Sequence, residues 1–211
     1  MFDETQTRYP QKSDRLIKET GDKEAKLLFA DWMVGKWSWY ADGFKLAADK
    51  VVDQITGEPW DDQLINPVIF MYRHFIELKL KEIILELDWL GGTAMDEERF
   101  TTHALIPLWT YLKEHIDCIR EPIHNEEIIP ALDSLIDELN KLDPDSFHFR
   151  YAVDKKFQPV NVPRCLSVAH FKEMVNVMNN GLSYLQNGVE IEVQRRRDEA
   201  QFAADNYTSF E

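Results

Sequence analysis

The stretch from Pro67 to Leu90 constrains the fold more than any other part of the sequence. Its apolar residues recur every three or four positions, which predicts a helix, and on a helical projection they fall on two sides. One side carries Ile69, Tyr72, Ile76, Leu80, Ile83, Ile84 and Leu87. The other side carries Met71, Leu78, Leu85 and Trp89. Because a helix that is apolar on two sides needs neighbours on both, the sequence predicts a central helix inside a helical bundle.

Signals at both ends give the bounds of this helix. Asn66 is a favoured N-cap residue, and Pro67 is favoured in the first helical turn. Gly91 and Gly92 are expected to end the helix, since glycine adopts the left-handed conformation that follows many helices.

Two polar strips separate the apolar sides. One strip, which we interpret as ordinary solvent-exposed surface, holds Lys79, Glu82 and Glu86. The other strip is rich in titratable groups and holds Arg73, His74, Glu77, Lys81 and Asp88. Glu77 lies four residues from both Arg73 and Lys81, so it can pair with either cation. This strip is either a salt-bridged helix surface or the lining of a cleft, where titratable groups often gather in functional sites.

Four further helices are expected around the central one. Their ranges are about 22–55 with a bend near Gly35, 103–120, 125–142, and 167 to beyond 201. Between the last two, the segment 147–163 alternates aromatic and polar residues, which predicts a short hairpin or extended stretch. The predicted fold is all-α: an up-and-down bundle of four to five core helices with a long C-terminal helix.

The distribution of polar and charged residues predicts three regions of the chain. Residues 1–21 are polar and are expected to form an N-terminal arm, and residues 22–190 are expected to form the bundle. Residues 191–211 are charged on all sides, which indicates a helical extension that projects into solvent or onto a partner.

The charge balance limits the class of function. The chain has 24 Lys and Arg against 38 Asp and Glu, a formal net charge of −14. This excludes a broad basic surface for coating nucleic acid, but it permits a small basic pocket or a basic protein partner. Two cysteines are typical of a reducing compartment, and no window is apolar over the length of a membrane span. We therefore expect a cytoplasmic protein that does not associate with membranes.

Metal and cofactor chemistry finds little support in the sequence. Glu121-Pro-Ile-His124 imitates half of a di-iron motif, but proline interrupts the helix and no second copy exists. Neither cysteine belongs to a Cys-x-x-Cys pair, and no glycine-rich phosphate loop is present. We expect no metal and no cofactor.

Several spaced motifs carry a family resemblance. Tyr72-Arg-His74 precedes Glu77-Leu-Lys-Leu-Lys81 in the central helix. His103-Ala-Leu-Ile-Pro-Leu-Trp109 and Phe149-Arg-Tyr151 follow. Over about residues 37–185 the chain resembles the HEPN superfamily. The resemblance implies an up-and-down bundle of four or five helices that usually forms a homodimer. It departs from the family pattern at Ala104, where bacterial members tend to have Asp.

The resemblance also implies a function. HEPN-like proteins act in prokaryotic and phage conflict systems, including antiviral defence and toxin–antitoxin pairs, as metal-independent ribonucleases or as RNA- or nucleotide-binding subunits. The ribonucleases carry an Arg and a His separated by four to six residues, and Arg164 and His170 fit this pattern. By the resemblance, His170 would move the proton of the ribose 2′-hydroxyl and Arg164 would stabilise the phosphorane. The start of the last helix suits phosphate binding.

The same motifs imply a polar cleft for RNA or a nucleotide. Its expected members are Arg73, His74, Glu77, Lys81, His103, Arg150 and Tyr151. We predict that Arg73, Glu77, His103 and Arg150 lie near one another, because the motifs that contain them converge in the bundle. The alternative is a non-catalytic HEPN-like scaffold or inhibitor module that uses its acidic surface to bind a basic protein partner.

Overall fold

The computed structural model describes most of the chain from residue 36 onward. The described residues are 10, 36–92, 96–116, 119, 126–144, 146–153, 157–158 and 165–208, without the side chains of 206–208. The chain divides into two compact units, residues 1–34 and residues 35–211. The helices that the structure describes all belong to the second unit. The expected arm and the expected start of the bundle at residue 22 therefore lie outside it.

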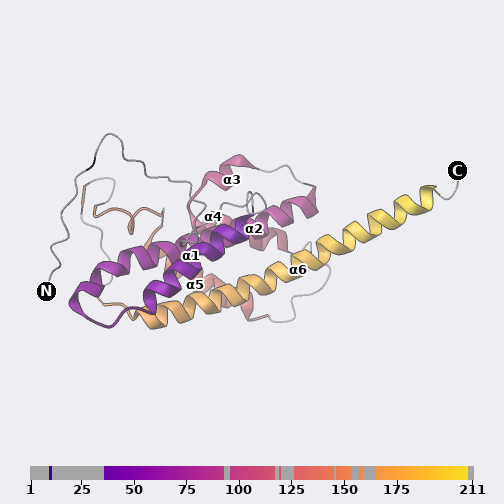
Figure 1. Ribbon diagram of the computed structural model, residues 1–211. Coiled ribbons are helices and arrows are strands. Elements are labelled where there is room, and N and C mark those ends of the chain that lie inside the picture. The colour runs from indigo at the N-terminus through magenta and orange to yellow at the C-terminus, as the bar shows by residue number, and fades with distance from the viewer. Residues whose placement is uncertain are drawn as a thin grey trace. The chain divides into compact units, whose positions relative to one another are not determined.

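Helices form this second unit (Figure 1). They are α1 (Trp37–Val52), the 3₁₀ helix η2 (Pro59–Leu64), α2 (Ile65–Gly91), α3 (Glu97–Thr101), α4 (Leu105–His115), α5 (Ile128–Leu142) and α6 (Val168–Thr208). The described residues form no strand. The predicted all-α helical bundle with a long C-terminal helix is confirmed. None of the described helices has the length and apolar character needed to cross a bilayer.

The central position predicted for α2 is also confirmed. Helices α1, α4 and α6 all pack against α2, and α5 packs against α4 and α6. The fully buried apolar side chains of α2 include Tyr72, Phe75, Ile76, Leu80 and Ile83. Burial of each large aliphatic side chain stabilises the fold by about 1.5–3 kcal/mol relative to exposure. The core therefore surrounds α2, and polar residues on this helix are enclosed unless they face a gap between its neighbours.

The start of α2 differs from the prediction. Asn66 is not the N-cap residue, because η2 leads directly into a helix that begins at Ile65. A capping box between Glu58 and Asp61 begins η2. The Asp61 carboxylate accepts hydrogen bonds from the backbone N–H groups of Thr56, Gly57 and Glu58. The end agrees with the prediction, since α2 stops at a left-handed Gly92.

The polar strip of Lys79, Glu82 and Glu86 is not ordinary solvent-exposed surface, and that prediction was wrong. The side chains of Lys79 and Glu82 are only 12% and 14% exposed. Glu86 accepts a hydrogen bond of 3.2 Å from Gln186 Nε2 of α6. Burial raises the pKa of Glu86 to about 7. A helical projection shows which residues share a side, but it does not show which sides a neighbouring helix covers.

Two connecting segments and the C-terminal helix also bear on the predictions. In the segment 147–163, expected to be extended or a hairpin, the described residues 147–153 and 157–158 are not helical and form turns without a strand. Between α2 and α4, where no helix was expected, lies the short helix α3. Helix α6 continues without interruption past residue 191, where the extension was expected to begin, and ends at Thr208.

Candidate functional site

Arg73 joins the central helix to two other parts of the chain. Its side chain is fully buried. Nε donates to the backbone oxygen of Asp143 at 2.9 Å, Nη1 to Glu77 Oε2 at 3.1 Å, and Nη2 to the backbone oxygen of His103 at 2.6 Å. Asp143 follows α5 and His103 lies just before α4. One guanidinium group therefore holds two helix ends against α2, which suits its rigid set of N–H donors.

Asp143 folds the chain back after α5. Its side chain is fully buried, and Oδ1 accepts hydrogen bonds from the backbone N–H groups of Phe147 at 2.7 Å and His148 at 3.0 Å. Oδ2 lies 3.5 Å from Arg73 Nε. The resulting turn leads the chain back to α2, where Arg150 lies beside the ring of Phe70.

Glu77 is the centre of a group of positively charged and imidazole side chains. Its side chain is 1% exposed, and Oε1 accepts a hydrogen bond of 2.8 Å from Lys81 Nζ. Oε1 also lies 3.0 Å from His103 Nδ1, and Oε2 lies 3.9 Å from His74 Nδ1. We call Arg73, His74, Glu77, Lys81 and His103 the Glu77 cluster.

The Glu77 carboxylate is charged at neutral pH. Burial alone would raise its pKa, but polar contacts with His74, Lys81 and His103, together with the charge of Lys81, outweigh burial and lower the pKa to about 2. A buried negative charge of this kind keeps neighbouring donors directed toward it.

His103 is the most accessible member of the Glu77 cluster. Its side chain is 50% exposed, while its Nδ1 faces the buried Glu77 carboxylate. Its Nε2 has no hydrogen-bond partner among the described residues. An imidazole that is oriented by a buried carboxylate and accessible to solvent is suited to proton transfer or to donation toward an anion.

Aromatic rings lie around Arg150, next to the Glu77 cluster. The guanidinium carbon of Arg150 lies 5.8 Å from the ring centroid of Phe70 and 5.9 Å from that of Tyr151. Phe70 stacks on His74, with centroids 5.7 Å apart and planes at 7°. Tyr151 stacks on Phe147, with centroids 4.4 Å apart, and its side chain remains 54% exposed. An exposed ring beside an arginine offers a surface on which a base can stack.

Arg150 uses one of its guanidinium nitrogens within the described part of the chain. Its Nε donates to the backbone oxygen of Ser146, and its two terminal nitrogens have no partner among the described residues. Phe70, which it contacts, and Glu77, which contacts His103, are two turns apart on α2. Arg150 and His103 thus contact the same side of α2 at positions separated by about 10 Å along its axis. We call His103, Arg150 and Tyr151 the candidate binding face.

The structure brings some of the predicted site residues together and leaves others apart. Arg73, Glu77, Lys81 and His103 are in direct contact, and His74 links them to the aromatic rings beside Arg150 and Tyr151. His170 is in the first turn of α6 with a side chain that is 66% exposed, and its Nδ1 lies 3.6 Å from Glu173 Oε2. No contact within the described part of the chain joins His170 to the Glu77 cluster. Arg164, its expected catalytic partner, lies outside the described residues.

A second buried polar group was not predicted. Asp88 Oδ2 accepts a hydrogen bond of 2.9 Å from Arg99 Nη1, and the Tyr111 hydroxyl also donates to Asp88. The Arg99 guanidinium carbon lies 3.5 Å from the ring centroid of Tyr111. Sequence spacing could not reveal this group, because its three members come from three different helices.

The described residues contain no group of three or more His, Cys, Asp or Glu side chains that could hold a metal ion. Comparison of the chain with protein-family models, curated proteins and solved structures gives no significant match. The function of the chain is therefore inferred from the geometry of the candidate binding face and of the helices around it.

Proposed function

We propose that this chain is a HEPN-like component of a prokaryotic or phage conflict system, and that it binds RNA or a nucleotide at the candidate binding face. One observation carries the proposal. Glu77, buried and negatively charged, orients a half-exposed His103 on the same side of α2 where Arg150 lies beside an exposed Tyr151, its terminal nitrogens without a partner among the described residues.

Each group has a role in this proposal. The terminal nitrogens of Arg150 are suited to a bidentate contact with a phosphate. The exposed face of Tyr151 is suited to stacking with a base, and stacking tolerates any base because each has a π face. His103 can donate from Nε2 to a phosphate or to a ribose hydroxyl. Arg73 and Lys81 are buried, so they support the carboxylate and do not contact the ligand.

The net charge of −14 limits the affinity of this chain for RNA, because most of its surface repels phosphates. A small basic face on an acidic protein contacts few phosphates, so binding is expected to depend weakly on salt, with a log–log slope of about −0.7 for each phosphate of a single strand. A slope that corresponds to many phosphates would indicate a different surface.

Replacement of Arg150 tests the binding face. With a labelled mixed-sequence single-stranded RNA of about 12 nucleotides, Arg150→Ala is expected to weaken binding about tenfold, measured by fluorescence anisotropy. Arg150→Lys should recover part of the loss, because lysine keeps the charge but not the fork of donors. Tyr151→Ala should also weaken binding, by about fivefold or more, because stacking contributes about 1–3 kcal/mol per base.

Arg197→Ala is the matched control, since it removes an exposed arginine from the far end of α6. Equal losses in Arg150→Ala and Arg197→Ala would show that only general charge matters and would contradict the binding face. Absence of RNA and nucleotide binding by the wild-type chain at micromolar concentration would contradict the proposed function.

A cleavage assay in EDTA separates a ribonuclease from a binding subunit. If the chain cuts RNA by the mechanism that the HEPN resemblance implies, cleavage persists in EDTA and His170→Ala lowers the rate about 100-fold or more, because general acid–base catalysis contributes at least that factor. His103→Ala is the informative comparison. Loss of cleavage in His103→Ala but not in His170→Ala would transfer the proton-transfer role to the histidine that Glu77 orients.

The second candidate function is a protein-interaction module. It is favoured by the acidic surface and by an apolar groove between α5 and α6.

A further inference from the structure

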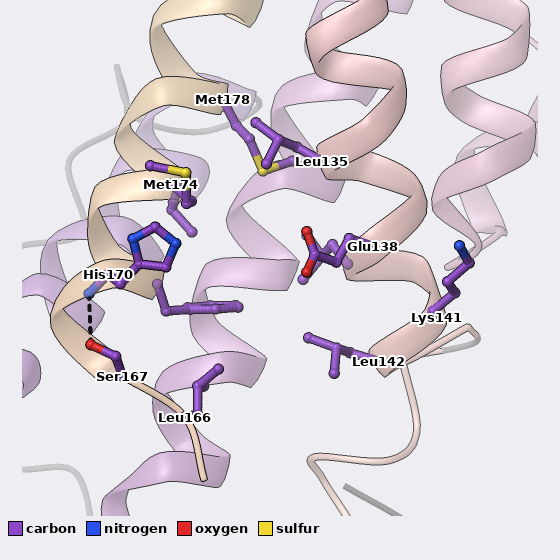
Figure 2. Close-up of a pocket in the computed structure, with 12 residues that line it drawn as sticks. Leu135, Glu138, Lys141, Leu142, Leu166, Ser167, His170, Met174 and Met178 are labelled. Carbon is purple, nitrogen blue, oxygen red and sulfur yellow. Dashed lines mark hydrogen bonds between the residues drawn. The ribbon is translucent and has the colours of Figure 1, made fainter. Parts of the chain in front are cut away.

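An apolar groove lies between α5 and the N-terminal part of α6 (Figure 2). Its volume is about 300 Å³. The apolar side chains that line it include Leu135 and Leu142 from α5 and Phe171, Met174 and Met178 from α6. This volume corresponds to the lower end of ligand-sized cavities. Two methionines give the groove an adaptable wall, because the methionine side chain is unbranched and polarisable.

The border of the groove is acidic. Glu138 of α5 points into the space between the two helices, as Figure 2 shows, and it has no ion-pair partner in the described part of the chain. On α6 the titratable side chain that lines the groove is His170, whose Nδ1 lies 3.6 Å from Glu173 Oε2. Lys141, the lysine among the described residues that line the groove, pairs with Asp137 at 2.5 Å. Glu138 of α5 is thus the carboxylate in the groove lining that a basic ligand can contact.

We propose that this groove binds a helical segment of a partner protein that has apolar residues on one side and basic residues at its flanks. A groove between two helices receives a third helix through side chains spaced three and four residues apart. The apolar floor fits such anchors, and the acidic border is complementary to lysine and arginine. Peptide binding here goes beyond RNA binding and does not depend on it, because His103, Arg150 and Tyr151 are not among the residues that line the groove.

A second copy of this chain is a poorer occupant on charge grounds. Each copy carries a formal charge of −14, so two acidic borders would repel each other. A basic helix instead gains attraction from the same charges.

The test uses two synthetic probe peptides and the full chain. Both peptides have about four helical turns and the same leucine positions at intervals of three and four residues. One has lysine and the other glutamate at the flanking positions. In fluorescence anisotropy, the lysine peptide is expected to bind at least about tenfold more tightly than the glutamate peptide, because like charges at an interface are strongly unfavourable.

Two variants locate the binding site of the lysine peptide. Glu138→Lys is expected to weaken binding about tenfold, because it replaces an attraction with a repulsion. Met174→Glu places a charge on the apolar wall and should abolish detectable binding. Glu114→Lys on α4 changes the net charge by the same amount away from the groove, and it should reduce affinity by less than about twofold. Circular dichroism and thermal melting check that each variant is folded. If Met174→Glu does not fold, Glu138→Lys, at an exposed position, still decides the test.

Three results would overturn the proposal. The first is equal affinity for the two peptides, and the second is an equal loss in Glu138→Lys and Glu114→Lys. The third is a wild-type dimer in light scattering that becomes a monomer in Glu138→Lys, since this would assign the groove to a second copy. Loss of RNA binding in Arg150→Ala with unchanged peptide binding would show that the RNA site and the peptide groove act independently, so that each proposal can be contradicted without the other.

Discussion

Arg73→Leu is expected to lower the free energy of unfolding by about 3–5 kcal/mol, since it breaks a buried ion pair and leaves charged and polar groups uncompensated. The Asp143 carboxylate would remain buried without the nearby cation. The backbone oxygens of Asp143 and His103 would lose the donors that now hold α5 and α4 to α2. Urea unfolding at neutral pH, followed by circular dichroism, measures the change.

Two comparisons interpret this result. Arg73→Lys keeps the charge but cannot make three fixed hydrogen bonds, so it should recover only part of the stability. Arg197→Leu removes an exposed arginine whose partner among the described residues is the half-exposed ring of Trp89, and it should leave the unfolding midpoint nearly unchanged. If Arg73→Leu lowers the free energy of unfolding by less than about 1 kcal/mol, Arg73 contributes no more than a surface salt bridge does. That result would contradict its predicted role in holding α4 and α5 to α2.

Glu77→Gln is expected to destabilise the fold by about 3 kcal/mol at neutral pH, because Arg73 and Lys81 lose the buried charge between them. The size of this effect should depend on pH. The folded pKa of Glu77 is about 2, below its ordinary value of 4.5. Between these values the unfolded chain binds a proton that the folded chain does not, so stability from Glu77 is complete above the unfolded pKa and is lost as pH falls toward 2.

The measurement is the difference in unfolding free energy between wild type and Glu77→Gln at several pH values. Carboxylates elsewhere titrate in both proteins and cancel in the difference. The difference should shrink as the solution is acidified from neutral pH through 4.5 toward 2. Glu138→Gln, which removes an exposed carboxylate, is the matched control and should change stability little at neutral pH. A difference for Glu77→Gln that stays constant down to the lowest pH would mean that its charge does not stabilise the fold.

The central helix could be predicted because its evidence is local. Apolar periodicity places residues on two sides of α2 without knowledge of any other helix. The pairs that Glu77 makes with Arg73 and Lys81 are visible in the same way, since four residues separate the members of each pair. The resemblance to HEPN motifs then suggested that His103 and Arg150 approach α2, which periodicity alone does not indicate.

Other features depend on how distant parts of the chain pack together, and no local sequence pattern predicts them. Two of the acceptors of Arg73 are backbone oxygens, and every residue has one of these. The enclosure of Glu86 depends on where α6 lies, and the groove with Met174 depends on the distance between two helices. The helix α3 has five residues, which is too short for a periodic pattern.

The Glu77 cluster has a consequence for how uniquely the chain folds. Helix α5 has an apolar side that could lie against its neighbours in more than one rotation, because apolar contacts are not directional. Charges are more selective. On α2, Arg73 and Lys81 share one buried carboxylate, that of Glu77. The second buried carboxylate, that of Asp143, lies beside Arg73 only when α5 ends at the correct position. Any other docking of α5 would bury a cation without its counterion, at a cost of several kcal/mol. We therefore infer that this cluster selects one packing of the bundle among those that the apolar core alone would allow.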